Sequence, residues 1–142
     1  MRNGLAAVPF DADIICVHDA ARPLASSDLF LSVIDAVVDG ADGAVPGAPV
    51  TDTIKIVDRD GPHVVVRSTP SRESLVAVQT PQAFRAEVLR AAHASGGEAT
   101  DDATLVELVG GRVVVVPSDA ANRKITNRDD LEWARRNASE PR

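Results

Sequence analysis

Residues 13–23 read Asp-Ile-Ile-Cys-Val-His-Asp-Ala-Ala-Arg-Pro, an apolar run followed directly by a polar loop. The compact apolar run at 14–17 predicts a short buried strand. Within it, Cys16 is expected to be a buried structural thiol rather than a nucleophile. Open α/β sheets bind ligands beyond the carboxyl ends of their strands. The loop at 18–23 is therefore the first candidate for a site.

The rest of the chain alternates between helical and extended patterns. Apolar residues at helical spacing, with Gly or polar residues at the ends, predict four helices, at about 28–39, 85–94, 101–109 and 127–136. Ser26 or Ser27, Thr100 or Asp101, and Asn127 stand where helix N-caps belong, because their side chains can accept from free backbone amides.

Extended segments lie between these helices. Short apolar runs predict strands at 43–50, 76–78 and 112–116, and a brief extended piece at 124–126. Pro46 and Pro49 should break the first of these, since proline donates no ladder hydrogen bond. Alternating strands and helices of this length imply a single α/β domain, with a largely parallel sheet and helices on its faces.

A hairpin pattern interrupts this alternation at about 52–70. Residues 53–57 and 63–67 are β-like and flank a turn that contains Asp60 and Gly61. An isolated two-stranded hairpin is marginal in water and needs a surface to lie against. We expect a protruding β-arm, and a second copy of the chain is one candidate for that surface.

Composition limits the partners. The chain of 142 residues is 44% hydrophobic and 25% charged, which is typical of a globular protein. A net charge of −6 argues against nucleic acid, but a few Arg and Lys residues can still hold one small phosphate. No apolar run approaches the ~20 residues of a membrane helix. The cytoplasm is therefore the expected location, without membrane contact.

Three loops collect the polar residues that could do chemistry: 18–23, 79–82 and the stretch around Lys124. Asp19 and Arg22 could bind hydroxyl and phosphate groups together, or could pair with each other and only stabilise the loop. The spacing leaves both readings open. His18 is expected to be a hydrogen-bonded histidine at a strand end rather than a base.

Metal-binding and phosphate-binding motifs are not evident in the sequence. Asp101 and Asp102 are best interpreted as helix-capping residues that complement the helix dipole, and a metal site is the lesser alternative. No His or Cys cluster has metal-ligand spacing. Neither common Gly-rich phosphate loop occurs in the 142 residues.

Five segments together resemble one family, the methylerythritol phosphate cytidylyltransferases of non-mevalonate isoprenoid synthesis. In the family's order they are VHDAARP at 17–23, DTIK at 52–55, QTPQ at 79–82, TDDA at 100–103 and KIT at 124–126. Each alone is a weak signal, but five in order across nearly the whole chain make a specific match.

The resemblance implies a Rossmann-like nucleotidyltransferase fold, a homodimer joined through the β-arm, and Mg²⁺-dependent transfer of CMP from CTP to 2-C-methyl-D-erythritol 4-phosphate. Mg²⁺ would be bound mainly through the CTP phosphates. The roles implied for single residues fall into four groups, with Arg72 and Lys124 as the catalytic residues. Asp19, Arg22 and Thr80 would bind the acceptor and Ala20 would lie at the nucleotide; Lys124 would hold the acceptor phosphate; Thr53 and Arg72 would reach the partner subunit's site.

One departure from the family pattern stands out. Family members begin with a strand and a Gly-rich loop whose arginine and lysine embrace the CTP phosphates, and this sequence has neither. Residues 1–5 resemble the middle of the family pattern. We therefore expect a partial domain, incomplete at its N-terminus, in which these 142 residues alone release no pyrophosphate from CTP.

Two other functions stay open on the sequence. Ribitol 5-phosphate cytidylyltransferases form a sister family with similar motifs, although the pair Ala20-Ala21 favours methylerythritol phosphate. A non-catalytic remnant that dimerises or binds only the acceptor would also fit a chain without the Gly-rich loop.

Overall fold

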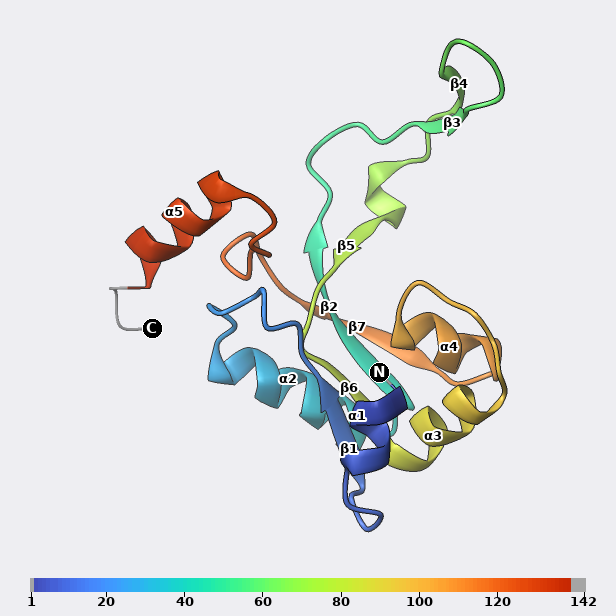
Figure 1. Ribbon diagram of the computed structural model, residues 1–142, viewed down its shortest axis with the longest axis vertical. Helices are drawn as coiled ribbons and strands as arrows, with labels where there is room; N and C mark the ends of the chain where they lie inside the picture. Colours follow the sequence, from blue (N-terminus) through green and yellow to red (C-terminus); the bar gives the residue numbers. More distant parts are fainter. Residues whose placement is uncertain (1, 139–142) are drawn as a thin grey trace.

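The computed structural model describes residues 2–138 (Figure 1). Its elements, in chain order, are α1 (Arg2–Ala7), β1 (Ile14–Val17), α2 (Ser27–Val38), β2 (Gly43–Pro49), β3 (Ile56–Asp58), β4 (Val65–Ser68), the 3₁₀ turn η1 (Arg72–Ser74), β5 (Val76–Val78), β6 (Gln82–Arg85), α3 (Ala86–Ala94), α4 (Asp102–Leu108), β7 (Val113–Pro117) and α5 (Arg128–Asn137).

The main sheet is mixed, and the prediction that it is largely parallel is wrong for the described residues. Its path runs β1-β6-β2-β5, with β7 beside β2. Only the β2–β7 pair is parallel there; the β1–β6, β2–β6 and β2–β5 pairs are antiparallel. Two strands run against the others: β6, which the sequence patterns did not reveal and which lies between β1 and β2, and β5 on the far side of β6 along the same edge of β2.

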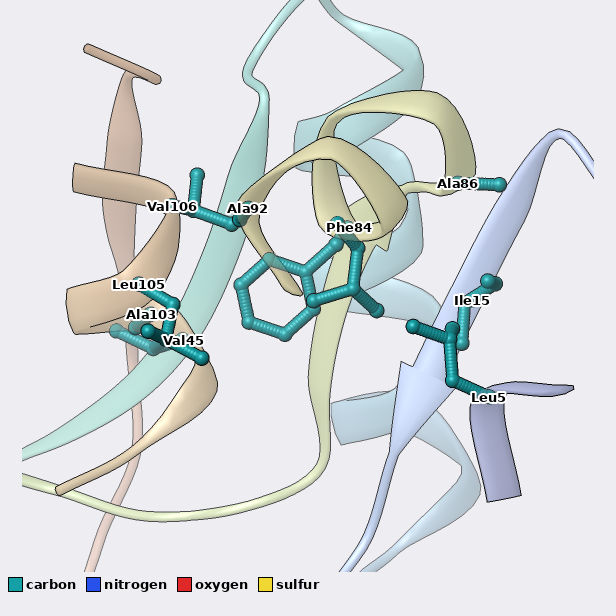
Figure 2. Close-up of a cluster of buried hydrophobic side chains, with 10 residues drawn as sticks. Leu5, Ile15, Val45, Phe84, Ala86, Ala92, Ala103, Leu105 and Val106 are labelled. Atoms are coloured by element: carbon teal, nitrogen blue, oxygen red, sulfur yellow. The ribbon is translucent and has the colours of Figure 1, made fainter. Parts of the chain in front are cut away.

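Helices cover both faces of this sheet, and the alternation of side chains along the strands divides the core in two. On one face, Phe84 lies at the centre of a cluster built by α1, α3 and α4, which Figure 2 shows. On the other, Ala83 and Ala44 pack against Val33 and Val37 of α2. Consecutive residues of β6 thus serve opposite layers.

Strand β2 tolerates a proline at its centre because of what lies beside it. The strand is continuous from Gly43 to Pro49, so the expected break is not found. The Pro46 carbonyl accepts from the Gln79 amide at 2.9 Å, in the gap between β6 and β5 along that edge. The N and C=O of one strand residue point to the same edge. The missing N–H of Pro46 therefore faces a gap in the ladder.

Gly43 belongs to the same strand for a packing reason. A Cβ at this position would lie 2.6 Å from a ring carbon of Phe84. Since such a contact is far inside van der Waals distance, only glycine lets β2 and β6 approach so closely.

The helix ends follow the capping pattern, which confirms the expected caps. Ser26, Asp101 and Asn127 each accept from a backbone amide in the first turn of α2, α4 and α5. Asp102 adds a contact at 2.8 Å to His93 of α3. The capping interpretation of Asp101 is therefore correct. None of the described helices combines the length and the apolar character needed to cross a membrane.

Cys16 corrects another expectation, because it is exposed rather than buried. Alternation along β1 places its neighbour Ile15 in the core beside Phe84. Cys16 points the other way on a strand that, within residues 2–138, pairs only with β6.

The hairpin forms a separate two-stranded sheet of β3 and β4, held away from the main sheet on extended segments (Figure 1). Gly61 supplies the left-handed turn, with a φ of 120°. Its apolar side chains have no core of their own, and all of these are exposed: Ile54, Ile56, Val64, Val65 and Val66.

Candidate functional site

Three loops meet where β1 and β7 end, and each carries residues singled out in the sequence. β1 leads into 18–23, β5 leads into 79–81, and β7 leads into 118–126. Hydrogen bonds join them: the Ile125 amide donates to the Ala21 carbonyl at 2.8 Å, and the Asp19 amide donates to Thr80 Oγ1 at 3.0 Å. Segments distant in sequence therefore form one surface.

Asp19 lies at the centre of that surface. Its backbone amide donates to Thr80 Oγ1 at 3.0 Å, and its Oδ1 accepts from the Ala21 amide at 3.1 Å. Its Oδ2 lies 2.7 Å from Lys124 Nζ. The Lys124 ammonium, and then the Ala21 amide, hold the pKa of Asp19 below its ordinary value. Asp19 is thus an ionised acceptor at neutral pH.

Arg22 lies beside this pair but is anchored differently. Its Nη1 donates to the Asn122 carbonyl at 2.6 Å. Burial lowers the pKa of Arg22, an effect that nearby Asp19 opposes. Arg22, Gln79 and Lys124 line a hollow of about 570 Å³ that extends toward Trp133 of α5. Two cations from different loops thus share one concave surface.

The segment that carries Lys124 is fixed on both sides. Ile125 is bound to Ala21, as described above, and Asp130 of α5 accepts from Thr126 and pairs with Arg123. These hydrogen bonds, led by the Thr126 hydroxyl, lower the pKa of Asp130 to about 2. Lys124 itself stays about half exposed, so its ammonium can reach both Asp19 and a ligand.

His18 has partners at both ring nitrogens. Nδ1 lies 3.2 Å from Thr80 Oγ1, and Nε2 lies 3.2 Å from the Arg22 carbonyl. Its ring packs against Phe30 with centroids 5.1 Å apart. The geometry agrees with the expected role of a hydrogen-bonded histidine at a strand end.

The structure does not bring every predicted residue together. Asp19, Arg22, Thr80 and Lys124 are linked as described, with Ala20 in the same loop. Arg72 lies in η1, where its Nη1 donates to the Thr51 carbonyl at 3.1 Å. Thr53 is exposed on the segment that leads into the arm. Within residues 2–138, no recorded hydrogen bond or ion pair joins these last two to Asp19.

Two buried amides in the site were missed as functional candidates. Gln79 belongs to the QTPQ segment, whose pattern indicates no separate role for it, and Asn122 stands in a polar loop without any pattern. A polar side chain in a loop looks solvated from sequence alone. Only the fold shows that both are buried, at 8% and 5% exposure.

A mixed α/β sheet that gathers a carboxylate, a hydroxyl and two cations beyond its strand ends has the features of a site for a small, hydroxyl-bearing phosphate. Residues 1–138 match the family model described as IspD, 2-C-methyl-D-erythritol 4-phosphate cytidylyltransferase. The chain belongs to this family.

Individual relatives agree with that assignment. The chain is 45% identical over 138 residues to a 2-C-methyl-D-erythritol 4-phosphate cytidylyltransferase of Rubrobacter xylanophilus, covering 94% of this chain and 58% of that one. It is 48% identical over 134 residues to a bifunctional enzyme IspD/IspF of Oleidesulfovibrio alaskensis, covering 91% of this chain and 33% of that one. The chain thus spans only part of the length of these relatives.

Solved structures match the fold as well. A 4-diphosphocytidyl-2C-methyl-D-erythritol synthase from Anaerococcus prevotii superposes with a TM-score of 0.85 at 31% identity, covering 97% of this chain and 62% of that one. A 2-C-methyl-D-erythritol 4-phosphate cytidylyltransferase from Thermus thermophilus gives 0.82 at 36% identity, covering 97% and 67%. The nucleotidyltransferase fold expected from the sequence is confirmed.

Proposed function

We propose that this chain forms the acceptor side of a cytidylyltransferase that transfers CMP from CTP to 2-C-methyl-D-erythritol 4-phosphate in isoprenoid precursor synthesis. The observation that carries the proposal is the joining of Asp19, Thr80 and Lys124 into one hydrogen-bonded cluster, with Arg22 beside it. Family membership supports the reaction class.

The roles follow from charge and position. Asp19 and Thr80 bind acceptor hydroxyls, because an ionised carboxylate accepts and a hydroxyl both donates and accepts. Lys124 acts as the catalytic cation that holds the acceptor phosphate, with Arg22 lining the same hollow. Ala20 lies at the nucleotide, where a small side chain leaves room.

The reaction requires that the protein position the two substrates, and it needs no covalent intermediate with the protein. An oxygen of the acceptor phosphate attacks the α-phosphorus of CTP and forms a new P–O bond. The bond from that phosphorus to the bridging oxygen breaks, and its electron pair leaves with pyrophosphate. Cations that hold the acceptor phosphate in line reduce the entropic and electrostatic cost of this step.

Mg²⁺ belongs to the proposal as a partner of CTP. Among residues 2–138, no group of three His, Cys, Asp or Glu side chains is placed to hold a metal ion. Oδ2 of Asp19 is already paired with Lys124. The described residues therefore do not fit an all-protein Mg²⁺ site, and the ion would enter on the nucleotide phosphates.

A homodimer through the β-arm also belongs to the proposal. The exposed apolar residues of β3 and β4 have nothing to pack against within the described chain. In a dimer, Thr53 and the catalytic Arg72 would act in the site of the partner subunit. The cytoplasmic location remains a prediction from the sequence.

A chimera tests the proposed reaction. The 142 residues are fused behind the amino-terminal segment of the Rubrobacter relative, which supplies the nucleotide side, and pyrophosphate release from CTP is followed with each acceptor. We expect turnover with methylerythritol phosphate. The variant Lys124→Met should lose this turnover, and the variant Lys55→Met, which changes a lysine of the arm, should keep it. A chimera that binds CTP but transfers CMP to neither acceptor, or prefers ribitol 5-phosphate, would contradict the proposal.

A further inference from the structure

Two buried amide side chains, those of Gln79 and Asn122, lie against each other beneath the acceptor site. Asn122 Nδ2 donates to Gln79 Oε1 at 3.0 Å and to the Thr80 carbonyl at 2.8 Å. Gln79 Oε1 also accepts from Ser118 Oγ at 2.8 Å, and Gln79 Nε2 donates to the Asp119 carbonyl at 2.9 Å. These bonds leave the Asn122 amide one orientation, with its nitrogen toward the site loops.

Asn122 is bonded to the functional residues themselves. Its backbone carbonyl accepts from Arg22 Nη1 at 2.6 Å. Thr80, whose carbonyl Asn122 holds, accepts the Asp19 amide at its hydroxyl. Two residues beyond Asn122 the chain reaches Lys124. All three loops of the site therefore meet at one residue: the side chain of Asn122 holds the 79–81 loop, and its backbone carbonyl holds Arg22.

We propose that Asn122 is a positioning residue that sets the placement of Arg22 relative to Lys124, with Gln79 fixing the orientation of its amide. The proposal rests on the proposed function for what these cations bind, but the positioning itself does not depend on it. Asn122 is not among the residues that line the hollow, and it acts through the residues it holds.

The buried amide pair of Gln79 and Asn122 should hold the site loops in place more firmly than the Asp19–Lys124 ion pair does. The Asp19–Lys124 contact is between partly exposed side chains, and exposed ion pairs hold loops weakly. The amide pair is buried, and breaking its bonds would leave further groups unpaired beside Asn122 Oδ1, which has no partner among the described residues, at a cost in free energy. The loops should therefore keep their spacing only while the amide pair is intact.

The first test needs no ligand. In the wild-type chain the Asn122 Nδ2 protons should exchange with solvent slowly, at rates like those of core amides, whereas those of Asn127, an exposed capping residue, should exchange fast. Fast exchange of the Asn122 protons would overturn the proposal whether or not any variant folds.

Variants then test the effect on the site. Asn122→Ala removes both side-chain bonds, and Asn122→Asp removes the donors without creating a cavity. Ser118→Ala is the matched control, because it removes a bond to the same Gln79 Oε1 but leaves the bonds of Asn122 to Gln79 and to the Thr80 carbonyl in place. Amide exchange is measured at Asp19 and Ile125, whose bonds join the loops, and at core positions of α3.

We expect the Asp19 and Ile125 amides to exchange about tenfold faster in the Asn122 variants, with α3 unchanged and Ser118→Ala like wild type. The dissociation constant for methylerythritol 4-phosphate should rise about tenfold in the same variants only. Equal effects of Ser118→Ala would show a general structural role and overturn the proposal. A wild-type chain that binds no acceptor would instead contradict the proposed function, leaving the exchange data to decide the positioning.

Discussion

Lys124 Nζ lies 2.7 Å from Asp19 Oδ2, although the two residues come from opposite ends of the described chain. One follows β1 and the other follows β7, and the Ile125–Ala21 backbone bond brings their loops together. The pair leaves Lys124 half exposed. The Lys124 ammonium can therefore exchange part of its contact with Asp19 for a contact with a phosphate oxygen.

Replacing Lys124 by Met should weaken binding of methylerythritol 4-phosphate by about ten- to a hundredfold, because a charged hydrogen bond of this kind contributes roughly 1.5–3 kcal/mol. Isothermal titration measures the effect. The matched control is Lys55→Met, since Lys55 lies on the arm and donates to Thr69. Equal loss in both variants would indicate a general charge effect and remove Lys124 from the site.

Asp130 should make folding stability depend on acid. Its pKa in the folded chain is about 2, below the ordinary 3.8. A lowered pKa stabilises the folded state above the ordinary value, and this contribution disappears as pH falls through about 2. The difference in melting temperature between wild type and Asp130→Asn should therefore be full at pH 6 and shrink toward pH 2.

The neighbouring Asp129 supplies the control for that measurement. It is exposed in the same first turn of α5, whereas Asp130 is buried by its partners. Asp129→Asn should change the melting temperature little at any pH. If the difference in melting temperature between wild type and Asp130→Asn stays constant down to pH 2, the Asp130 carboxylate is not the cause of that difference.

The β-arm should control the oligomeric state. Val65 and Val66 are adjacent in β4, point to opposite faces, and are both exposed. We therefore expect at least one of the two variants Val65→Asp and Val66→Asp to be a monomer in light scattering where the wild type is a dimer. The new carboxylate would place a charge in an apolar contact. Leu31→Asp, at a similarly exposed site on α2, should leave the dimer intact. A wild-type chain that is monomeric at micromolar concentration would contradict the arm proposal.

Arg72→Ala should raise the KM for the acceptor in the active chimera and lower kcat/KM about ten- to a hundredfold, with little change for CTP. The structure places Arg72 in η1, bonded to the Thr51 carbonyl and away from the Asp19 cluster of its own chain. A change in the KM for the acceptor without a change for CTP would mean that Arg72 reaches the site of the partner subunit. Unchanged kinetics would remove Arg72 from the reaction.

The sequence predicted four of the five described α-helices, α2 to α5, because capping residues such as Asn127 and Asp101 act locally and within a few residues; it did not predict α1. It failed at β6, where only four residues, Gln82–Arg85, form a strand directly before α3. Their extended shape depends on partners in β1 and β2 that lie far away in the chain, so no local pattern reveals it. The sheet direction was wrong for the same reason.

The site shows a similar division. Asp19, Arg22, Thr80 and Lys124 could be selected because polar residues after strands, and their family motifs, are visible in the sequence. Asn122 could not, because its importance comes from burial between three loops rather than from its neighbours. The predicted burial of Cys16 failed because an apolar run does not say which face of a strand is covered.

The most direct test of the account is a titration of the isotopically labelled 142-residue chain with methylerythritol 4-phosphate, followed by amide NMR. The account predicts saturable shifts at Asp19, Ala20, Thr80 and Lys124, with weaker binding of ribitol 5-phosphate and of inorganic phosphate. The shifts should disappear in Lys124→Met and persist in Lys55→Met. Absence of shifts in a folded wild-type chain, or shifts confined to residues outside these loops, would contradict the assignment of this surface as the acceptor site.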